Sequence, residues 1–224
     1  MELISESRSD RKRKLLLAAA TEMFLDKGYD GTTMEEVAMK AEVSKPTIYR
    51  FFSDKERLFA EIVRATTGEI DELVRLVVEI MAEQTDVEAG LMMLARRFLN
   101  ALMQPRVLRL RRLVMANAER FPDVGRGWYE HGFDRVLATL GTTFGSLADR
   151  RLLHVEDPLL AANHFVGMLL WIPINKAMYT GDYRSSPGEL EGYAVGAVRA
   201  FLAGYGTPSG TIPRSTNAGV RKRP

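Results

Sequence analysis

The chain has 224 residues, of which 46% are apolar and 27% are charged. These proportions are typical of a globular protein with a sizeable core, and they exclude a disordered or fibrous chain. The absence of cysteine excludes disulfides, thiolate catalysis and cysteine-bound metals. A formal net charge of +2 is too small to indicate nucleic-acid binding by itself, so the placement of the charges has to decide.

Apolar runs in the chain are short. The longest, residues 165–174, contains Gly167 and Pro173 and falls short of the roughly 20 residues that span a bilayer. The N-terminal region has charges at 8–14 and lacks the apolar run and small-residue cleavage site of a signal peptide. We therefore expect a cytoplasmic protein without a membrane partner.

Helical periodicity begins early in the chain. Apolar residues at i, i+3 and i+4 spacing predict a first helix over 10–27, which Gly28 ends. Thr33-Met-Glu-Glu36 has the spacing of a capping box and predicts a short second helix. A third helix of about two turns is predicted from Ser44, with Pro46 in its first turn.

Similar signals continue downstream. Ser53-Asp-Lys-Glu56 is a second capping box and opens a long fourth helix with period extending to Ile80. Later helix starts occur at Thr85, Asp157-Pro158 and Ser186-Pro187. The predicted later helices cover 86–103, 106–120, 122–149, 157–178 and 187–204. No stretch has the alternation of a strand, so we predict an all-α fold.

The second and third helices predict a helix-turn-helix over 33–52, with its turn at Glu42-Val43. Packing of the pair would expose Lys45, Pro46, Thr47, Tyr49 and Arg50 on the third helix. A cation, an apolar wedge and hydroxyls suit the phosphates and base edges of a major groove. Helix pairs with short turns are also common in all-α cores, so geometry alone leaves a purely structural role open.

Residues 28–58 closely resemble the N-terminal domain of TetR-family transcriptional regulators. The resemblance rests on Phe24, Gly28-Tyr29, Thr32-Thr33, Val43-Ser44, Tyr49, Phe52 and Lys55. Glu42 departs from the pattern, because it stands where the family usually has Gly. If that turn residue needs a positive φ, Glu costs on the order of 1 kcal/mol, which a packed motif tolerates.

The resemblance implies two groups of DNA contacts. Bases would be faced by Lys45, Pro46 and Thr47, and phosphates would be held by Thr33, Ser44, Tyr49 and Lys55. Thr33 and Lys55 lie at predicted helix N-termini, where free N–H groups already favour an anion. The alternative is that Thr33 and Ser53 are only caps, that Lys55 is a solvated charge and that Tyr49 packs on Phe52.

The densest cluster of positive charge lies near the N-terminus. Its members are Arg8, Arg11, Lys12, Arg13 and Lys14, opposed only by Asp10. Residues 1–64 carry twelve basic and twelve acidic side chains, so attraction to DNA would depend on one-sided placement. We predict a flexible basic arm over 1–9 and a DNA-binding domain over 10–70; a solvated helix start is the alternative.

Residues 71–205 form the predicted second domain and carry no defensible catalytic constellation. His131, His154 and His164 are far apart and lack a metal-ligand pattern, and no Gly-rich phosphate loop or nucleophile elbow occurs. We expect neither an enzyme nor a cofactor or metal. Residues 206–224 are rich in Gly, Pro, Ser and Thr, which predicts a disordered tail.

Methionine and aromatic side chains are frequent in this second domain, where they can line a cavity or simply fill a core. Residues 111–132 look like the C-terminal domain of AefR-like members of the same family. The resemblance implies a small apolar effector enclosed between helices. The candidate pocket residues are Met92, Phe98, Met115, Trp128 and Phe165.

The last two predicted helices have the features of an interface between subunits. Helix 157–178 is apolar nearly all round, and Gly192 and Gly196 permit close helix approach on 187–204. Two such helices from each subunit can form a four-helix bundle, the homodimer that the resemblance also implies. We therefore predict a repressor that binds a palindromic operator in double-stranded DNA. The alternative is an all-α carrier or enzyme for an apolar small molecule.

Overall fold

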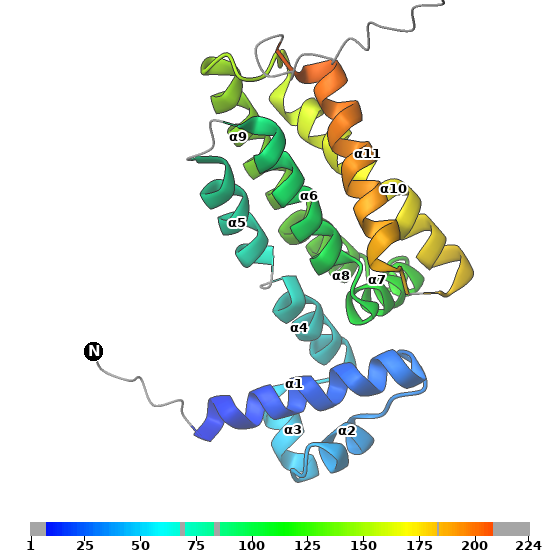
Figure 1. The fold of residues 1–224 in the computed structure, drawn as a ribbon. Helices are drawn as coiled ribbons and strands as arrows, with labels where there is room; N and C mark the ends of the chain where they lie inside the picture. Colours follow the sequence, from blue (N-terminus) through cyan, green and yellow to red (C-terminus); the bar gives the residue numbers. More distant parts are fainter. Residues whose placement is uncertain (1–7, 68–69, 83–85, 183, 208–224) are drawn as a thin grey trace, which may run out of the picture.

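The computed structural model describes residues 8–67, 70–82, 86–182 and 184–207 (Figure 1). Its elements are α1 (Arg8–Lys27), α2 (Met34–Lys40), α3 (Lys45–Phe51), α4 (Lys55–Thr67), α5 (Ile70–Ala82), α6 (Val87–Leu102), α7 (Pro105–Asn117), α8 (Pro122–Trp128), the π-helix η1 (Tyr129–Asp134), α9 (Arg135–Asp149), α10 (Pro158–Thr180) and α11 (Pro187–Tyr205). Within these ranges the only β-type pairing is an isolated bridge between Leu153 and Gly206. The all-α prediction is confirmed.

The helices form two groups, joined by α4 (Figure 1). Helices α1–α3 lie together at one end of the molecule, and α4 leads from them toward the other group. Helices α5, α6, α9, α10 and α11 form the larger bundle, while α7 and α8 lie near its junction with α4. This is the predicted small N-terminal unit followed by a larger helical region.

Two hydrophobic cores support these groups. The larger bundle is filled by an aromatic cluster in which the Phe201 ring centroid lies 5.1 Å from Phe144 and 5.3 Å from Phe165. The N-terminal core is built on Phe24 and Phe59 and also includes residues of α7 and α8. The second core therefore crosses the predicted division at residue 70.

Helix starts follow the predicted caps in most places. Thr33 and Ser186 form complete capping boxes, and Asp157 accepts a hydrogen bond from the Leu160 amide at 2.9 Å. The predicted box at Ser53 is wrong. Asp54 caps α4 instead, accepting from the Arg57 amide at 2.7 Å, since a carboxylate both accepts the bond and complements the helix dipole.

Several predicted boundaries differ from the structure. Helix α7 ends at Asn117, three residues before the predicted end at 120, and the helix start predicted at Thr85 lies outside the described residues. The long helix predicted from Ser53 is described as α4 and α5, and their junction at 68–69 lies outside the described residues. The helix predicted over 122–149 contains the π-helical turn η1, so its hydrogen-bond register shifts midway. Helix α1 begins at Arg8, which makes the basic cluster helical. Residues 1–7 and 208–224, which hold most of the predicted arm and tail, lie outside the described residues.

Helix α10 is long and apolar enough, by length and composition, to cross a membrane, the one such helix in the described ranges. Helices in the core of a globular protein can meet the same criteria of length and apolar composition. Phe165 and Leu169 of α10 are fully buried in the larger bundle. On another face of the same helix, Trp171 is 71% exposed and Ile172 is 56% exposed.

Candidate nucleic-acid interface

The outer surface of α3 follows from the way its inner side is anchored. Ile48 and Phe52 are fully buried in the N-terminal core, which holds the short helix by two side chains one turn apart. The opposite side, which we call the reading face, consists of Lys45, Pro46, Thr47, Tyr49 and Arg50. Thr47 is half-buried and the other four are exposed. Four of the five residues predicted to be exposed on this helix are therefore exposed, and Thr47 is partly so.

The turn between α2 and α3 has the strained residue that the sequence pattern indicated. Glu42 has a φ of 54°, a left-handed conformation in which Gly is usual. The Val43 amide donates to the Ala38 carbonyl at 2.9 Å, and the Glu42 amide donates to Met39 at 3.1 Å. These bonds end α2 and set the angle of α3, and they offset a cost of about 1 kcal/mol for the side chain at this position.

Glu35 of α2 reaches the reading face. Its Oε1 lies 2.6 Å from the Lys45 ammonium and accepts a longer bond of 3.4 Å from the Tyr49 hydroxyl. The Lys45 ammonium also lies 5.9 Å from the centroid of the Tyr49 ring. The hydrogen bond from Lys45 lowers the pKa of Glu35, and the same bond raises the pKa of Lys45. Both groups are therefore ionised at neutral pH.

Glu35 was missed by the sequence analysis because its contacts are tertiary. It lies inside the capping sequence that predicts α2, and nothing local connects it to a residue ten positions later. Its carboxylate engages one ammonium donor of Lys45 and the hydroxyl of Tyr49. Tyr49 makes this contact and is 40% exposed, and no ring contact joins it to Phe52 in the described structure.

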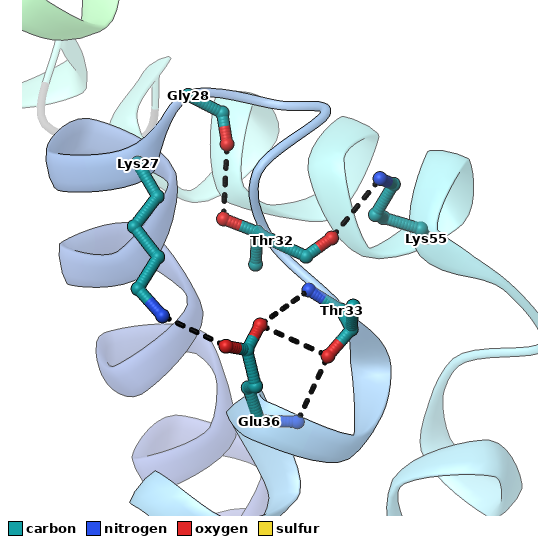
Figure 2. Close-up of polar contacts among 6 residues, drawn as sticks. All are labelled: Lys27, Gly28, Thr32, Thr33, Glu36 and Lys55. Atoms are coloured by element: carbon teal, nitrogen blue, oxygen red, sulfur yellow. Dashed lines mark hydrogen bonds and ion pairs between the residues drawn. The ribbon is translucent and has the colours of Figure 1, made fainter.

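Thr33 and Glu36 form a compact network at the start of α2 (Figure 2). The Thr33 hydroxyl accepts from the Glu36 amide at 3.2 Å, and Glu36 Oε2 accepts from the Thr33 amide at 3.0 Å. Lys27, at the end of α1, pairs with Glu36 Oε1 at 2.8 Å. The bond from Lys27, followed by those from Thr33, lowers the pKa of Glu36 to about 2. Thr33 thus serves as the N-cap of α2.

Lys55 connects the start of α4 to the turn before α2. Its Nζ donates to the carbonyls of Tyr29 at 2.9 Å and Thr32 at 3.0 Å, the second of which is drawn in Figure 2. The ammonium also lies 4.3 Å from the Tyr29 ring centroid. Two of the three ammonium donors are used in this way, which leaves one for an external acceptor.

Ser44 and the basic cluster have their own contacts. The Ser44 and Thr47 hydroxyls lie 2.8 Å apart, and Ser44 makes no side-chain cap to α3. Arg13 pairs with Glu61 of α4, and its guanidinium lies 5.7 Å from the Phe52 ring centroid. Arg13 therefore links α1 to α4 and to Phe52 at the end of α3, whereas Arg8 and Arg11 are exposed on the first turns of α1.

A cavity lies in the larger group of helices, between α4, α6, α7, α9 and α10. We call it the inner cavity; it provides about 100 Å³ of space for the centre of a water molecule. Its walls are mainly apolar, with Phe98 and Trp128 from the predicted pocket set and Phe133 from η1. Thr66 of α4 and Arg111 of α7 are the polar lining residues.

The structure separates the other predicted pocket residues from the inner cavity. Met115 lines a more open hollow on the surface of α7 and α10, which we call the outer groove. Phe165 lies in the buried aromatic cluster instead. Met92 lies over a shallow surface hollow on α6. Arg111 was missed by the sequence analysis, because a single arginine on a helix carries no local sign that it points inward.

Comparison with known proteins agrees with this arrangement. Residues 16–62 match the model described as bacterial regulatory proteins of the tetR family, and residues 89–207 match the AefR-like transcriptional repressor C-terminal domain. The second match alone covers more than half of the chain. The protein belongs to the TetR family. The chain is thus a transcriptional regulator of a helix-turn-helix family, and the resemblance identified in the sequence is confirmed.

Individual proteins that are similar to this chain are also transcriptional regulators or are named as regulators. A crystal structure of a TetR-family regulator from Mesorhizobium loti MAFF303099 is 50% identical with a TM-score of 0.85, covering 90% of this chain and all of that chain. The flavonoid-responsive regulator FrrA is 26% identical with a TM-score of 0.69, covering 88% and 98% of the two chains. The transcriptional activator FasR of Mycolicibacterium smegmatis is 39% identical over 77 residues, 34% of this chain and 34% of its own length.

Proposed function

We propose that this TetR-family protein is a homodimeric repressor that binds a palindromic operator and is released from it by a small apolar effector. The observation that carries the DNA-binding part is the exposed reading face of α3, held by the buried side chains of Ile48 and Phe52. Its Lys45, Pro46 and Thr47 face the bases in the proposed complex. Repression is favoured by the AefR-like repressor domain that the C-terminal region matches.

Phosphates are held around this face in the proposed complex. Thr33, Ser44 and Tyr49 supply hydroxyls, and Arg50 supplies a charge. Lys55 donates its third N–H to a phosphate, while its other two donors stay on the carbonyls of Tyr29 and Thr32 in the turn between α1 and α2. Glu35 releases Lys45 and Tyr49 when a phosphate or base edge takes its place. Contacts of this kind position the protein, while Lys45 to Thr47 supply sequence discrimination.

A homodimer is supported by the unpartnered side of α10 and α11. Trp171 and Ile172 are large apolar side chains more than half exposed in the single chain. On α11, an added Cβ at Gly192 or Gly196 meets nothing within 4 Å, so these glycines make no close approach within the chain and stay open to a second copy. Exposed apolar area of this kind marks a protein interface.

Coupling between effector and operator is proposed to run through α4. Thr66 of α4 lines the inner cavity, and Lys55 at the other end of the same helix holds the turn that precedes α2. A ligand that displaces Thr66 therefore shifts α4, and with it the Lys55 contacts that position α2 and the adjoining α3. Two recognition helices must stay about 34–36 Å apart to meet successive turns of the major groove, so a small shift weakens both half-sites.

Selection of binding sites from random duplex DNA tests the proposal. We expect enrichment of one palindromic sequence, bound with an affinity that falls steeply with salt. No enriched sequence, together with tight binding of an apolar small molecule, would contradict the proposal and favour the carrier or enzyme.

A further inference from the structure

Arg111 places a cation against the apolar wall of the inner cavity. Its guanidinium carbon lies 4.7 Å from the Phe133 ring centroid. The Arg111 Nε is buried and has no hydrogen-bond partner in the described part of the chain. Arg111 lines both the inner cavity and the outer groove, and neither lining contains an acidic side chain. The guanidinium thus stands between the two spaces without a counter-ion among their lining residues.

Neighbouring arginines are placed differently. Arg112 donates to the carbonyls of Ala177 and Met178 at the end of α10. Arg120 forms an ion pair with Asp30 at 2.7 Å. Burial lowers the pKa of Arg111 to about 10, so its guanidinium still carries a charge at neutral pH. A buried charge without a partner is unfavourable for folding, and such costs are often retained where a ligand provides the missing partner.

We propose that the inner cavity binds a small organic carboxylate, whose apolar body fills the cavity and whose carboxylate pairs with Arg111. This inference rests on the proposed function and refines it, because it gives the mainly apolar effector one charged group, a carboxylate. A guanidinium suits a carboxylate because its parallel N–H groups can donate to both oxygens. The Phe133 ring lies against the guanidinium and stabilises its charge through a cation–π contact.

The size of the cavity limits the apolar body. About 100 Å³ is less than the roughly 150 Å³ of an apolar cavity that holds benzene, so a short alkyl chain or at most one aromatic ring is the largest body that the cavity suits. Arg111, Phe133 and Val166 line both the inner cavity and the outer groove. The carboxylate therefore lies at the end of the cavity that meets the groove, and the body lies against Phe98 and Trp128.

Calorimetric titration with matched probes tests this inference on the full chain. The probes are 3-phenylpropanoate against 3-phenyl-1-propanol, and hexanoate against 1-hexanol, which differ mainly in the anionic group. We expect the wild-type protein to bind at least one carboxylate about ten- to a hundredfold more tightly than its alcohol. Arg111→Gln should remove the preference. Arg97→Gln, which removes an exposed arginine beside Phe98 on α6, should keep it.

Equal affinity for both members of each pair, no carboxylate binding, or a preference that survives in Arg111→Gln would overturn the inference. Thermal unfolding of Arg111→Met without ligand gives a second readout. We expect a higher Tm, because the substitution removes an unpaired buried charge at similar volume; a lower Tm would show a structural role instead. Wild-type operator binding is measured in parallel, so its failure counts against the proposed function and not against the carboxylate site.

Discussion

The rings of Tyr29 and Phe121 lie with their centroids 4.7 Å apart, joining the turn after α1 to the start of α8. Two cations flank Tyr29, Lys55 at 4.3 Å and Arg120 at 5.2 Å from its ring centroid. Desolvation raises the pKa of the Tyr29 phenol, in keeping with its buried position. At Tyr29, therefore, α4 and the α7–α8 region both contact the turn between α1 and α2.

Truncating this junction should destabilise the whole chain. Phe121→Ala removes a buried ring that contacts both Tyr29 and Phe59, and it should lower the free energy of unfolding by about 3–5 kcal/mol. Chemical denaturation followed by circular dichroism measures this. Tyr129→Ala is the matched control, since that aromatic side chain is 56% exposed, and it should change stability far less. Similar small losses in both variants would contradict a shared core.

Releasing the reading face should strengthen binding to random DNA. Glu35→Gln removes a carboxylate that holds Lys45 and Tyr49, so we expect severalfold tighter binding to random duplex and a steeper dependence on salt. Fluorescence anisotropy over a range of salt concentrations measures both. The control is Glu88→Gln on α6, a charge change remote from α3 that should leave DNA affinity unchanged. Weaker binding of Glu35→Gln to random DNA would show that Glu35 orders the face for binding.

Lys55 has two separable roles. Lys55→Met removes two charge-assisted bonds to backbone carbonyls and should lower the free energy of unfolding by about 1–3 kcal/mol. If its third donor also holds a phosphate, the salt slope of DNA binding should decrease in magnitude by about 1 per subunit. Lost stability with an unchanged slope would limit Lys55 to its structural contacts.

Lowering the pH should reduce the stability that ionised Glu36 contributes at the start of α2. The pKa of this carboxyl is lowered to about 2, so its contribution to stability is complete above its unfolded pKa of about 4.3 and disappears as the pH falls toward 2. Glu36→Gln should therefore be less stable than wild type at pH 7, and the difference should shrink between about pH 4.5 and 2. A constant difference in Tm across that range would contradict the ionised network with Lys27 and Thr33.

The dimer can be tested without disturbing the fold of one chain. Gly196→Leu adds a side chain where the single chain offers open space, so it should fold normally and give monomers in analytical ultracentrifugation. Arg97→Leu on α6 is the control and should remain dimeric. A folded, fully dimeric Gly196→Leu would exclude this part of α11 from the interface.

Local signals made much of the fold predictable. The capping boxes at Thr33 and Ser186 and the cap at Asp157 involve residues only three positions apart, so the sequence alone specifies them. The pair of Glu35 with Lys45 and the inward position of Arg111 depend on how helices pack, which periodicity does not encode. The π-helical turn η1 could not be predicted from periodicity either, because it is a local shift of hydrogen-bond register within an otherwise helical pattern.

The central claim is that α3 reads DNA sequence, and the ratio of affinities for operator and random duplex tests it most directly. Once the operator is selected, its dissociation constant and that of random DNA are measured at one salt concentration for the wild-type protein and Lys45→Ala. We expect Lys45→Ala to lose about 1–3 kcal/mol on the operator, roughly 5- to 150-fold, and far less on random DNA. Equal losses on both would contradict base reading by the helix.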